Sequence, residues 1–225
     1  MHLASPTKPR GPLASRLMGA RALVRKLLEG TPYKSAHWIR NAEVDAIRRF
    51  LSQLPTDTMD LVEVSGTQWR HEATWQSWTE LDYPEFDLTA PDHERRYDVV
   101  ICCHVLEHVA DPWRAARALQ DLCRPGGYVI VVTPFLIKIH RTPADYWRFT
   151  PDGLARLFDG MEIVELGSWG NAWAVAANLR IFIAERRWVR WLDRWTMRNN
   201  PATPTSVWVI ARRPGGDHPG GDRNC

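Results

Sequence analysis

The feature that most constrains this chain is a strand–helix–strand succession near its middle. An almost wholly apolar run at 97–102 is followed by a helical segment and a second apolar run at 127–132. Asp111 can cap the N-terminus of that helix, Pro112 suits its first turn, and Pro125-Gly126-Gly127 predicts its end. Strands that are apolar throughout are typical of a sheet covered on both faces, and a right-handed crossover makes neighbouring strands parallel. The sequence therefore predicts an α/β fold with a locally parallel sheet.

The remaining elements fit one domain with two tails. Further strands are expected at 59–64, 161–166 and 206–212, and further helices at 16–29, 35–53, 153–158 and 180–198. We expect a flexible N-terminal tail at 1–15, a single domain at 16–213 and a disordered C-terminal tail at 214–225. The length of 225 residues suffices for a hydrophobic core, and no uncharged apolar stretch is long enough to predict a membrane span.

Charge and cysteine usage exclude several classes. The net charge of +3 is too small to indicate a nucleic-acid-binding protein, and we expect no nucleic-acid partner. The distribution is uneven: residues 51–179 hold ten basic and nineteen acidic side chains, whereas 1–50 hold ten and three. Four cysteines without CxxC spacing favour reduced thiols, and the N-terminus has no apolar core of a signal peptide. A cytoplasmic location is the expectation.

Polar residues follow the predicted strands where ligands bind in open α/β sheets. The three strand ends carry Glu63 to Thr67, Cys102-Cys103-His104 and Thr133-Pro134-Phe135. The block around them, with Tyr97-Asp98, Leu106-Glu107-His108 and Pro125-Gly126-Gly127 in order, resembles the central part of class I S-adenosylmethionine-dependent methyltransferases. The segment after it, HRTPADYWRFTPDGLARLF, resembles members associated with polysaccharide biosynthesis.

The resemblance implies a Rossmann-like three-layer α/β sandwich with a mostly parallel sheet, S-adenosylmethionine as cofactor and no metal. The family's first motif, usually E-x-G-x-G-x-G, is reduced here to Glu63-Val64-Ser65-Gly66-Thr67-Gln68-Trp69, with a single glycine. Only about thirty residues separate Gly66 from Tyr97, so the second strand and its helix must be abbreviated. The predicted cofactor-binding residues are Glu63, Ser65, Gly66, Asp82, Asp87, Cys103 and His104. For Asp82 and Asp87 the alternative is a solvated loop carboxylate.

Candidate acceptor-side residues lie in the segment after the third strand. His140, Asp145 and Tyr146 are the catalytic candidates, and Arg141 and Arg148 are the candidates for binding the acceptor. The alternative is a packed loop in which Arg141 pairs with Asp145. His108 has either a structural or a cofactor-lining role. Cys102, Cys103 and His104 lack the separated ligand pairs of a zinc site, so no metal is expected there.

The segment 181–198 predicts a basic amphipathic helix with tryptophans on one stripe and arginines on another. It can cap the acceptor site or the domain core, or lie on an anionic membrane surface. The predicted function is methyl transfer from S-adenosylmethionine to a small-molecule or glycan-type acceptor by in-line displacement. The alternatives are a catalytically degenerate binding module and a membrane-surface adaptor that acts through 181–198.

Overall fold

The structure is a computed structural model that describes residues 40–141, 143–172, 174–176 and 198–215. The predicted helix at 16–29, the tail at 1–15, residues 180–197 of the predicted helix at 180–198 and residues 216–225 of the predicted tail at 214–225 lie outside the described residues. The helices are α2 (Asn41–Leu51), α3 (Pro112–Leu122) and α4 (Pro151–Arg156). The strands are β1 (Asp60–Val64), β2 (Ser77–Leu81), β3 (Tyr97–Cys103), β4 (Cys123–Pro134), β5 (Glu162–Trp169) and β6 (Ser206–Arg212).

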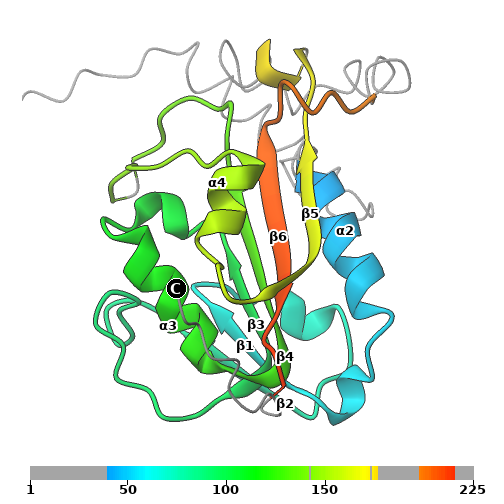
Figure 1. Cartoon of the computed structure of the whole chain (residues 1–225), viewed down its shortest axis with the longest axis vertical. Helices are drawn as coiled ribbons and strands as arrows, with labels where there is room; N and C mark the ends of the chain where they lie inside the picture. The colour runs from blue at the N-terminus through cyan, green and yellow to red at the C-terminus, as the bar shows by residue number, and fades with distance from the viewer. Residues whose placement is uncertain (1–39, 142, 173, 177–197, 216–225) are drawn as a thin grey trace, which may run out of the picture. The chain divides into compact units, whose positions relative to one another are not determined.

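The six strands form one sheet in the order β2-β1-β3-β4-β6-β5 (Figure 1). The pairs β1–β2, β1–β3 and β3–β4 are parallel, whereas β6 runs antiparallel to both β4 and β5. The predicted α/β fold with a mostly parallel sheet is confirmed. Because β1, β2, β3 and β4 run in the same direction, their carboxyl ends meet at one edge of the sheet.

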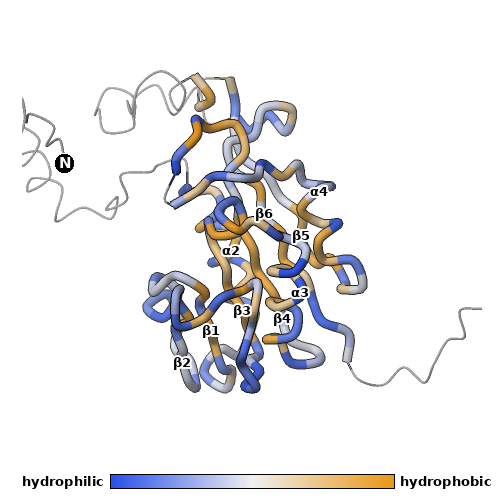
Figure 2. Tube along the Cα trace, turned by 90° about the vertical axis from the view of Figure 1, so that its left-hand side faces the viewer, coloured by the Kyte–Doolittle hydropathy of each residue, from blue (hydrophilic) through white to orange (hydrophobic). Residues whose placement is uncertain are grey.

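Helices cover both faces of the sheet, which gives three layers. Helix α3 packs on β3 and β4, and α4 packs on β5 and β6. On that face alternate apolar residues such as Val62, Val100 and Val131 join α3 and α4 in one buried cluster. Helix α2 lies against the other face, where the rings of Phe50 and Tyr128 meet edge to face at 5.0 Å. Figure 2 shows the apolar residues concentrated in the strands and the polar residues in the connecting loops.

The sequence signals for α3 predict its start correctly but not its end. Asp111 caps α3 by accepting a hydrogen bond from the Arg114 amide, and Pro112 is its first residue, as predicted. The helix, however, ends at Leu122, and Pro125-Gly126-Gly127 lies inside β4, where the pairing with β3 shifts register. Gly126 has a φ of +82°, and a Cβ on Gly127 would lie 2.6 Å from the Asp98 carbonyl oxygen. The glycines therefore serve a strand irregularity and not a helix end.

The segment between β1 and β3, predicted to be abbreviated, contains the complete strand β2. Strand β2 pairs in full register with β1, from Asp60 opposite Ser77 to Val64 opposite Leu81. Among the described residues, all of 65–96 included, no α-helix joins β1 to β2 or β2 to β3; a 3-10 turn at Trp69–His71 stands in the first connection. The strand is thus kept and the helices are lost.

Among the described residues, no helix is both long and apolar enough to cross a membrane.

Candidate active site

Two residues with left-handed backbone mark the carboxyl edge of the sheet. Ser65, just after β1, has a φ of 55°, and His104, just after β3, has a φ of 58°. L-residues adopt this conformation at a cost, and such strain gathers at functional sites. The amide of Ser65 donates to Leu81 O at 2.9 Å, and that of His104 donates to Val132 O at 2.8 Å. Neighbouring strands therefore hold both strained turns in place.

The first turn is held by Glu63 instead of by glycines. This carboxylate is 2% exposed and accepts hydrogen bonds from the amides of Trp69 (3.0 Å) and Arg70 (2.9 Å). It also accepts one from the indole Nε1 of Trp78 at 2.9 Å. Gly66 would tolerate a side chain in space, since its Cβ would only reach Glu63 Oε2 at 3.5 Å. The residue that adopts the glycine-like conformation is Ser65 and not Gly66.

The two predicted loop carboxylates differ in their surroundings. Asp82 follows β2 directly, is exposed, and accepts the Ser65 hydroxyl at 2.7 Å and the Tyr83 amide at 3.0 Å. Asp87 accepts both the amide and the hydroxyl of Thr89 at 2.7 Å, which lowers the pKa of its carboxyl. Asp82 therefore joins the ends of β1 and β2, whereas Asp87 closes its own turn.

Cys103 is the last residue of β3, and His104 follows it beside α2. Burial raises the pKa of the Cys103 thiol well above its ordinary value, so this cysteine is a neutral thiol at physiological pH. His104 Nε2 bonds Glu43 of α2 at 2.7 Å, and Glu43 also accepts the hydroxyl of Ser206 at the start of β6. Glu43 is 3% exposed, and it was not among the residues selected from the sequence. It ties α2 to the ends of β3 and β6.

Glu107, in the 3-10 turn after β3, lies at the centre of a histidine cluster. Its side chain is fully buried, and burial raises the pKa of its carboxyl. Oε1 lies 3.7 Å from His108 Nε2, 3.8 Å from His140 Nε2 and 3.9 Å from His104 Nδ1. The rings of His108 and His140 meet edge to face at 4.9 Å. We call these four residues the Glu107 cluster.

The loop after β4 brings the acceptor-side candidates to this cluster. Asp145 is 1% exposed, accepts the His140 amide at 2.9 Å and lies 3.4 Å from His140 Nδ1. Both terminal guanidinium nitrogens of Arg148 bond Asp145, and this pairing lowers the pKa of its carboxyl. Asp145 therefore pairs with Arg148, and not with Arg141 as in the alternative considered from the sequence. Burial lowers the pKa of His140, against the opposing effect of Asp145, which favours its neutral form.

The other two candidates of this segment lie at the surface. Tyr146 is 57% exposed, while its amide donates to Glu107 O at 2.7 Å. Arg141 is exposed as well. Both side chains could therefore contact a ligand only at the protein surface, outside the Glu107 cluster.

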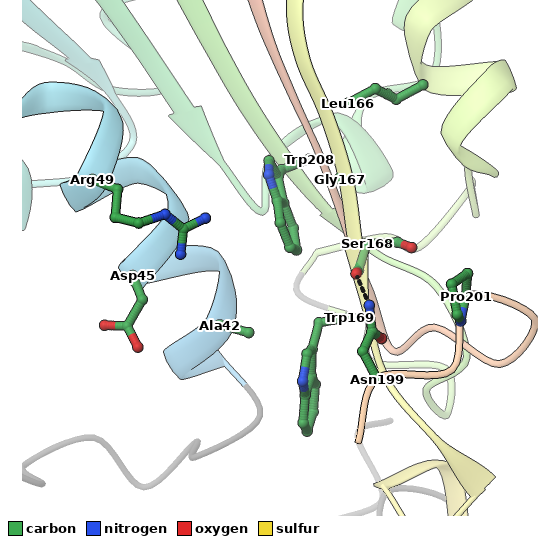
Figure 3. A pocket seen from close by; sticks show the side chains of 10 residues that line it. All are labelled: Ala42, Asp45, Arg49, Leu166, Gly167, Ser168, Trp169, Asn199, Pro201 and Trp208. Carbon is green, nitrogen blue, oxygen red and sulfur yellow. Dashed lines mark hydrogen bonds between the residues drawn. The ribbon is translucent and has the colours of Figure 1, made fainter. Parts of the chain in front are cut away.

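A separate groove of about 600 Å³ lies between α2 and β5 (Figure 3). The close-up shows Trp169 and Trp208 on one wall and Arg49 of α2 on the other, with the Asn199 amide bonded to Ser168 O at 2.8 Å. None of the residues predicted from the sequence to form the site lines this groove. It belongs to the α2 side of the sheet.

A family profile described as a methyltransferase domain matches residues 35–208.

The chain belongs to this methyltransferase-domain family.

Class I methyltransferases use S-adenosylmethionine as the methyl donor, and the six-stranded, helix-covered sheet is of their Rossmann-like type. A solved structure of the N-methyltransferase NodS from Bradyrhizobium japonicum, in complex with S-adenosyl-L-homocysteine, is similar in fold. Its TM-score is 0.51 at 13% identity, over 83% of this chain and 90% of that one.

Curated relatives match over a shorter stretch. A ubiquinone biosynthesis O-methyltransferase of Leptothrix cholodnii is 34% identical over 90 residues, which is 39% of this chain and 36% of that protein. One of Aeromonas salmonicida is 42% identical over 71 residues, or 30% of this chain and 27% of that protein. The chain thus spans about a third or less of the length of these relatives.

Residues at the carboxyl edge of this methyltransferase-domain chain offer groups that could hold part of the cofactor. Exposed Ser65 and Asp82 present a hydroxyl and a carboxylate side by side, a pair that could hydrogen-bond the ribose hydroxyls of S-adenosylmethionine. The left-handed turn at Ser65 gives the backbone the shape that a glycine would give it. Glu63 is committed to the turn itself, so it positions the loop instead of meeting a ligand.

Proposed function

We propose that this protein transfers a methyl group from S-adenosylmethionine to a hydroxyl of a small-molecule or glycan-type acceptor by in-line displacement. The observation that carries the proposal is the position of His140 beside the carboxyl edge of β3 and β4, with its Nδ1 3.4 Å from the buried Asp145 carboxylate to which Arg148 is bonded. The family supplies the cofactor, and the site supplies a group that can accept a proton.

Methyl transfer depends more on the alignment of the two reactants than on a large number of catalytic groups. When bound, S-adenosylmethionine supplies a methyl carbon that is already activated by its sulfonium. The methyl–sulfur bond breaks as the methyl–oxygen bond forms, and the hydroxyl proton leaves to a base. Holding the two reactants in line accounts for much of the rate.

We assign the cofactor side to Ser65, Gly66 and Asp82, with Cys103 and His104 at the end of β3. Asp82 would accept the ribose hydroxyls, and the Ser65 hydroxyl fixes the position of the Asp82 carboxylate. Glu63 would hold the turn. Asp87 keeps a cofactor role only as a secondary candidate, because Thr89 already engages its carboxylate.

On the acceptor side, His140 would act as the general base. A histidine that acts as general base must be neutral to accept a proton, and burial lowers the pKa of His140, which favours that form. Asp145 is the positioning residue, with Arg148 holding it in place. Exposed Tyr146 and Arg141 are the candidates for contacting a polar or sugar-bearing acceptor.

One observation favours a second candidate function, a binding module without catalysis. The first turn lacks the glycines of the family, and the Glu63 carboxylate already accepts hydrogen bonds from Trp69, Arg70 and Trp78.

A membrane-surface role through 181–198 also stays a prediction. Cosedimentation with anionic vesicles, with and without Trp188, Trp191 and Trp195, would test that role.

The test of the main proposal is transfer of a labelled methyl group to panels of phenolic, polyol and sugar hydroxyl acceptors. We expect a labelled product with one class of acceptor. His140→Ala should lower kcat by about 10²–10⁴-fold with little change in cofactor affinity. His71→Ala, which removes an exposed histidine outside the Glu107 cluster, is the matched control. Cofactor binding without transfer to any of the acceptors would favour the binding module.

A further inference from the structure

The Glu107 carboxylate is the least explained polar group of the described residues. Both of its oxygens are buried, and neither has a hydrogen-bond partner within the described part of the chain. The nearest ring nitrogens, on His108, His140 and His104, lie 3.7, 3.8 and 3.9 Å from Oε1. These distances are too long for direct hydrogen bonds. Burying a carboxylate without hydrogen-bond partners costs free energy. A water molecule or an ion between these groups would lower that cost.

The spacing of these atoms suits a metal ion. Ligand atoms of Glu107, His108 and His140 all lie within 4.8 Å of one another. Nitrogen and oxygen ligands sit at about 2.0–2.2 Å from a zinc ion, so two of them in a tetrahedral site are about 3.3–3.6 Å apart. A shift of a few tenths of an ångström would bring the ring nitrogens and Oε1 to that separation. The buried, unpartnered Nδ1 of His104 faces the same carboxylate.

The groups behind the two histidines already have the arrangement of a metal site, with a hydrogen bond behind His108 and a carboxylate 3.4 Å from Nδ1 behind His140. His108 uses its Nδ1 on the carbonyl of Ala144, which leaves the lone pair of Nε2 toward Glu107. His140 turns its Nδ1 to Asp145 and its Nε2 to Glu107. A metal-bound histidine almost always donates its other ring nitrogen to a carbonyl or carboxylate, which fixes the tautomer and the ring.

We propose that Glu107, His108 and His140 bind a divalent transition-metal ion. Two imidazoles and one carboxylate favour Zn²⁺, Co²⁺ or Ni²⁺ over Mg²⁺ and Ca²⁺, which prefer sets of oxygen ligands. The site joins the turn after β3 to the loop after β4, which are more than thirty residues apart in the sequence. It does not use Cys102 or Cys103.

Metal binding would have a consequence for catalysis, and this consequence rests on the proposed function. The lone pair of His140 Nε2 cannot both hold a metal and accept the proton of an acceptor. A bound ion therefore blocks the general base, so Zn²⁺ inhibits methyl transfer and a chelator relieves the inhibition.

The experiment is a titration of chelator-treated full-length protein with Co²⁺, followed by its visible absorption, together with the zinc content per chain after dialysis. We expect one Co²⁺ per chain with the intense d–d bands of a four-coordinate site. His108→Ala and His140→Ala should each remove these bands, whereas His71→Ala should keep them. Bands that persist in both cluster variants, or zinc well below one ion per chain, would overturn the proposal and leave an ordered water as the occupant.

A milder variant guards against loss of folding. Asp145→Asn keeps the size of the side chain behind His140 and should weaken Zn²⁺ binding by about 10–100-fold, as expected for a group that orients a ligand. Wild-type affinity in this variant would contradict the arrangement described above. Binding of S-adenosylmethionine, measured on the same samples without metal, separates failure of the metal site from failure of the proposed function.

Discussion

Replacing Glu63 by glutamine tests how this chain builds its first turn without the family's glycines. The carboxylate accepts hydrogen bonds from the amides of Trp69 and Arg70 and from the indole of Trp78, at 2.9–3.0 Å. Hydrogen bonds to a charged group contribute about 1.5–3 kcal/mol each. Glutamine keeps one accepting oxygen but turns an NH₂ group toward the remaining donors. We therefore expect Glu63→Gln to lower the free energy of unfolding by about 2–4 kcal/mol.

Urea unfolding followed by circular dichroism measures this change, and a thermal scan gives a second value. For a chain of this size, about 1 kcal/mol corresponds to roughly 2–4 °C in Tm, so a loss of about 5–15 °C is expected. Glu72→Gln is the matched control, because Glu72 pairs at 2.7 Å with Arg48, which is half exposed, and such pairs contribute about 1 kcal/mol or less. If Glu63→Gln unfolds at the same urea concentration as Glu72→Gln, the carboxylate does not hold the turn and our reasoning is refuted.

Three further predictions follow from the same structure. Asp82→Asn should weaken binding of S-adenosylmethionine about tenfold, or about 1.4 kcal/mol, while the Tm stays within about 2 °C of the wild type; calorimetric titration measures the affinity. Arg124→Gln should destabilise the protein by about 1 kcal/mol at neutral pH, a value that allows for screening because Arg124 is 40% exposed. Hydrogen bonds from Ser77 and Arg124 lower the pKa of Asp60, so the stabilisation is present above about pH 4 and is lost as the pH falls through the lowered pKa; urea unfolding at pH 7 and pH 3 should show the difference shrink. Gly127→Ala should cost about 1–3 kcal/mol in urea unfolding, because its Cβ would lie 2.6 Å from a backbone carbonyl oxygen of β3.

Local signals were sufficient to predict the core of the fold. Apolar runs marked β3 and β6, and Asp111 and Pro112 marked the start of α3, because strand burial and helix capping are decided by nearby residues. The predicted end of α3 was wrong, also for a local reason. The glycines of Pro125-Gly126-Gly127 permit a close approach between β3 and β4, and the sequence gives no sign of which neighbour a glycine accommodates.

The site was harder to predict because its contacts join distant segments. Glu43 meets His104, 61 residues away, and Ser206, 163 residues away. In the sequence Glu107 is only a member of the Leu106-Glu107-His108 motif, and it is the fold that shows three histidines around it. The pairing of Asp145 with Arg148 instead of Arg141 depends on the path of the loop, which residue types alone do not specify.

The central claim is that the carboxyl edge of β1, β2 and β3 binds S-adenosylmethionine although the first turn has a single glycine. Isothermal titration of the purified full-length chain with S-adenosylmethionine tests it most directly. The account predicts one site per chain with a Kd between about 1 μM and 1 mM, the usual range for enzyme substrates, and about tenfold weaker binding for Asp82→Asn. No heat of binding at near-millimolar cofactor, from a chain that unfolds cooperatively, would contradict it.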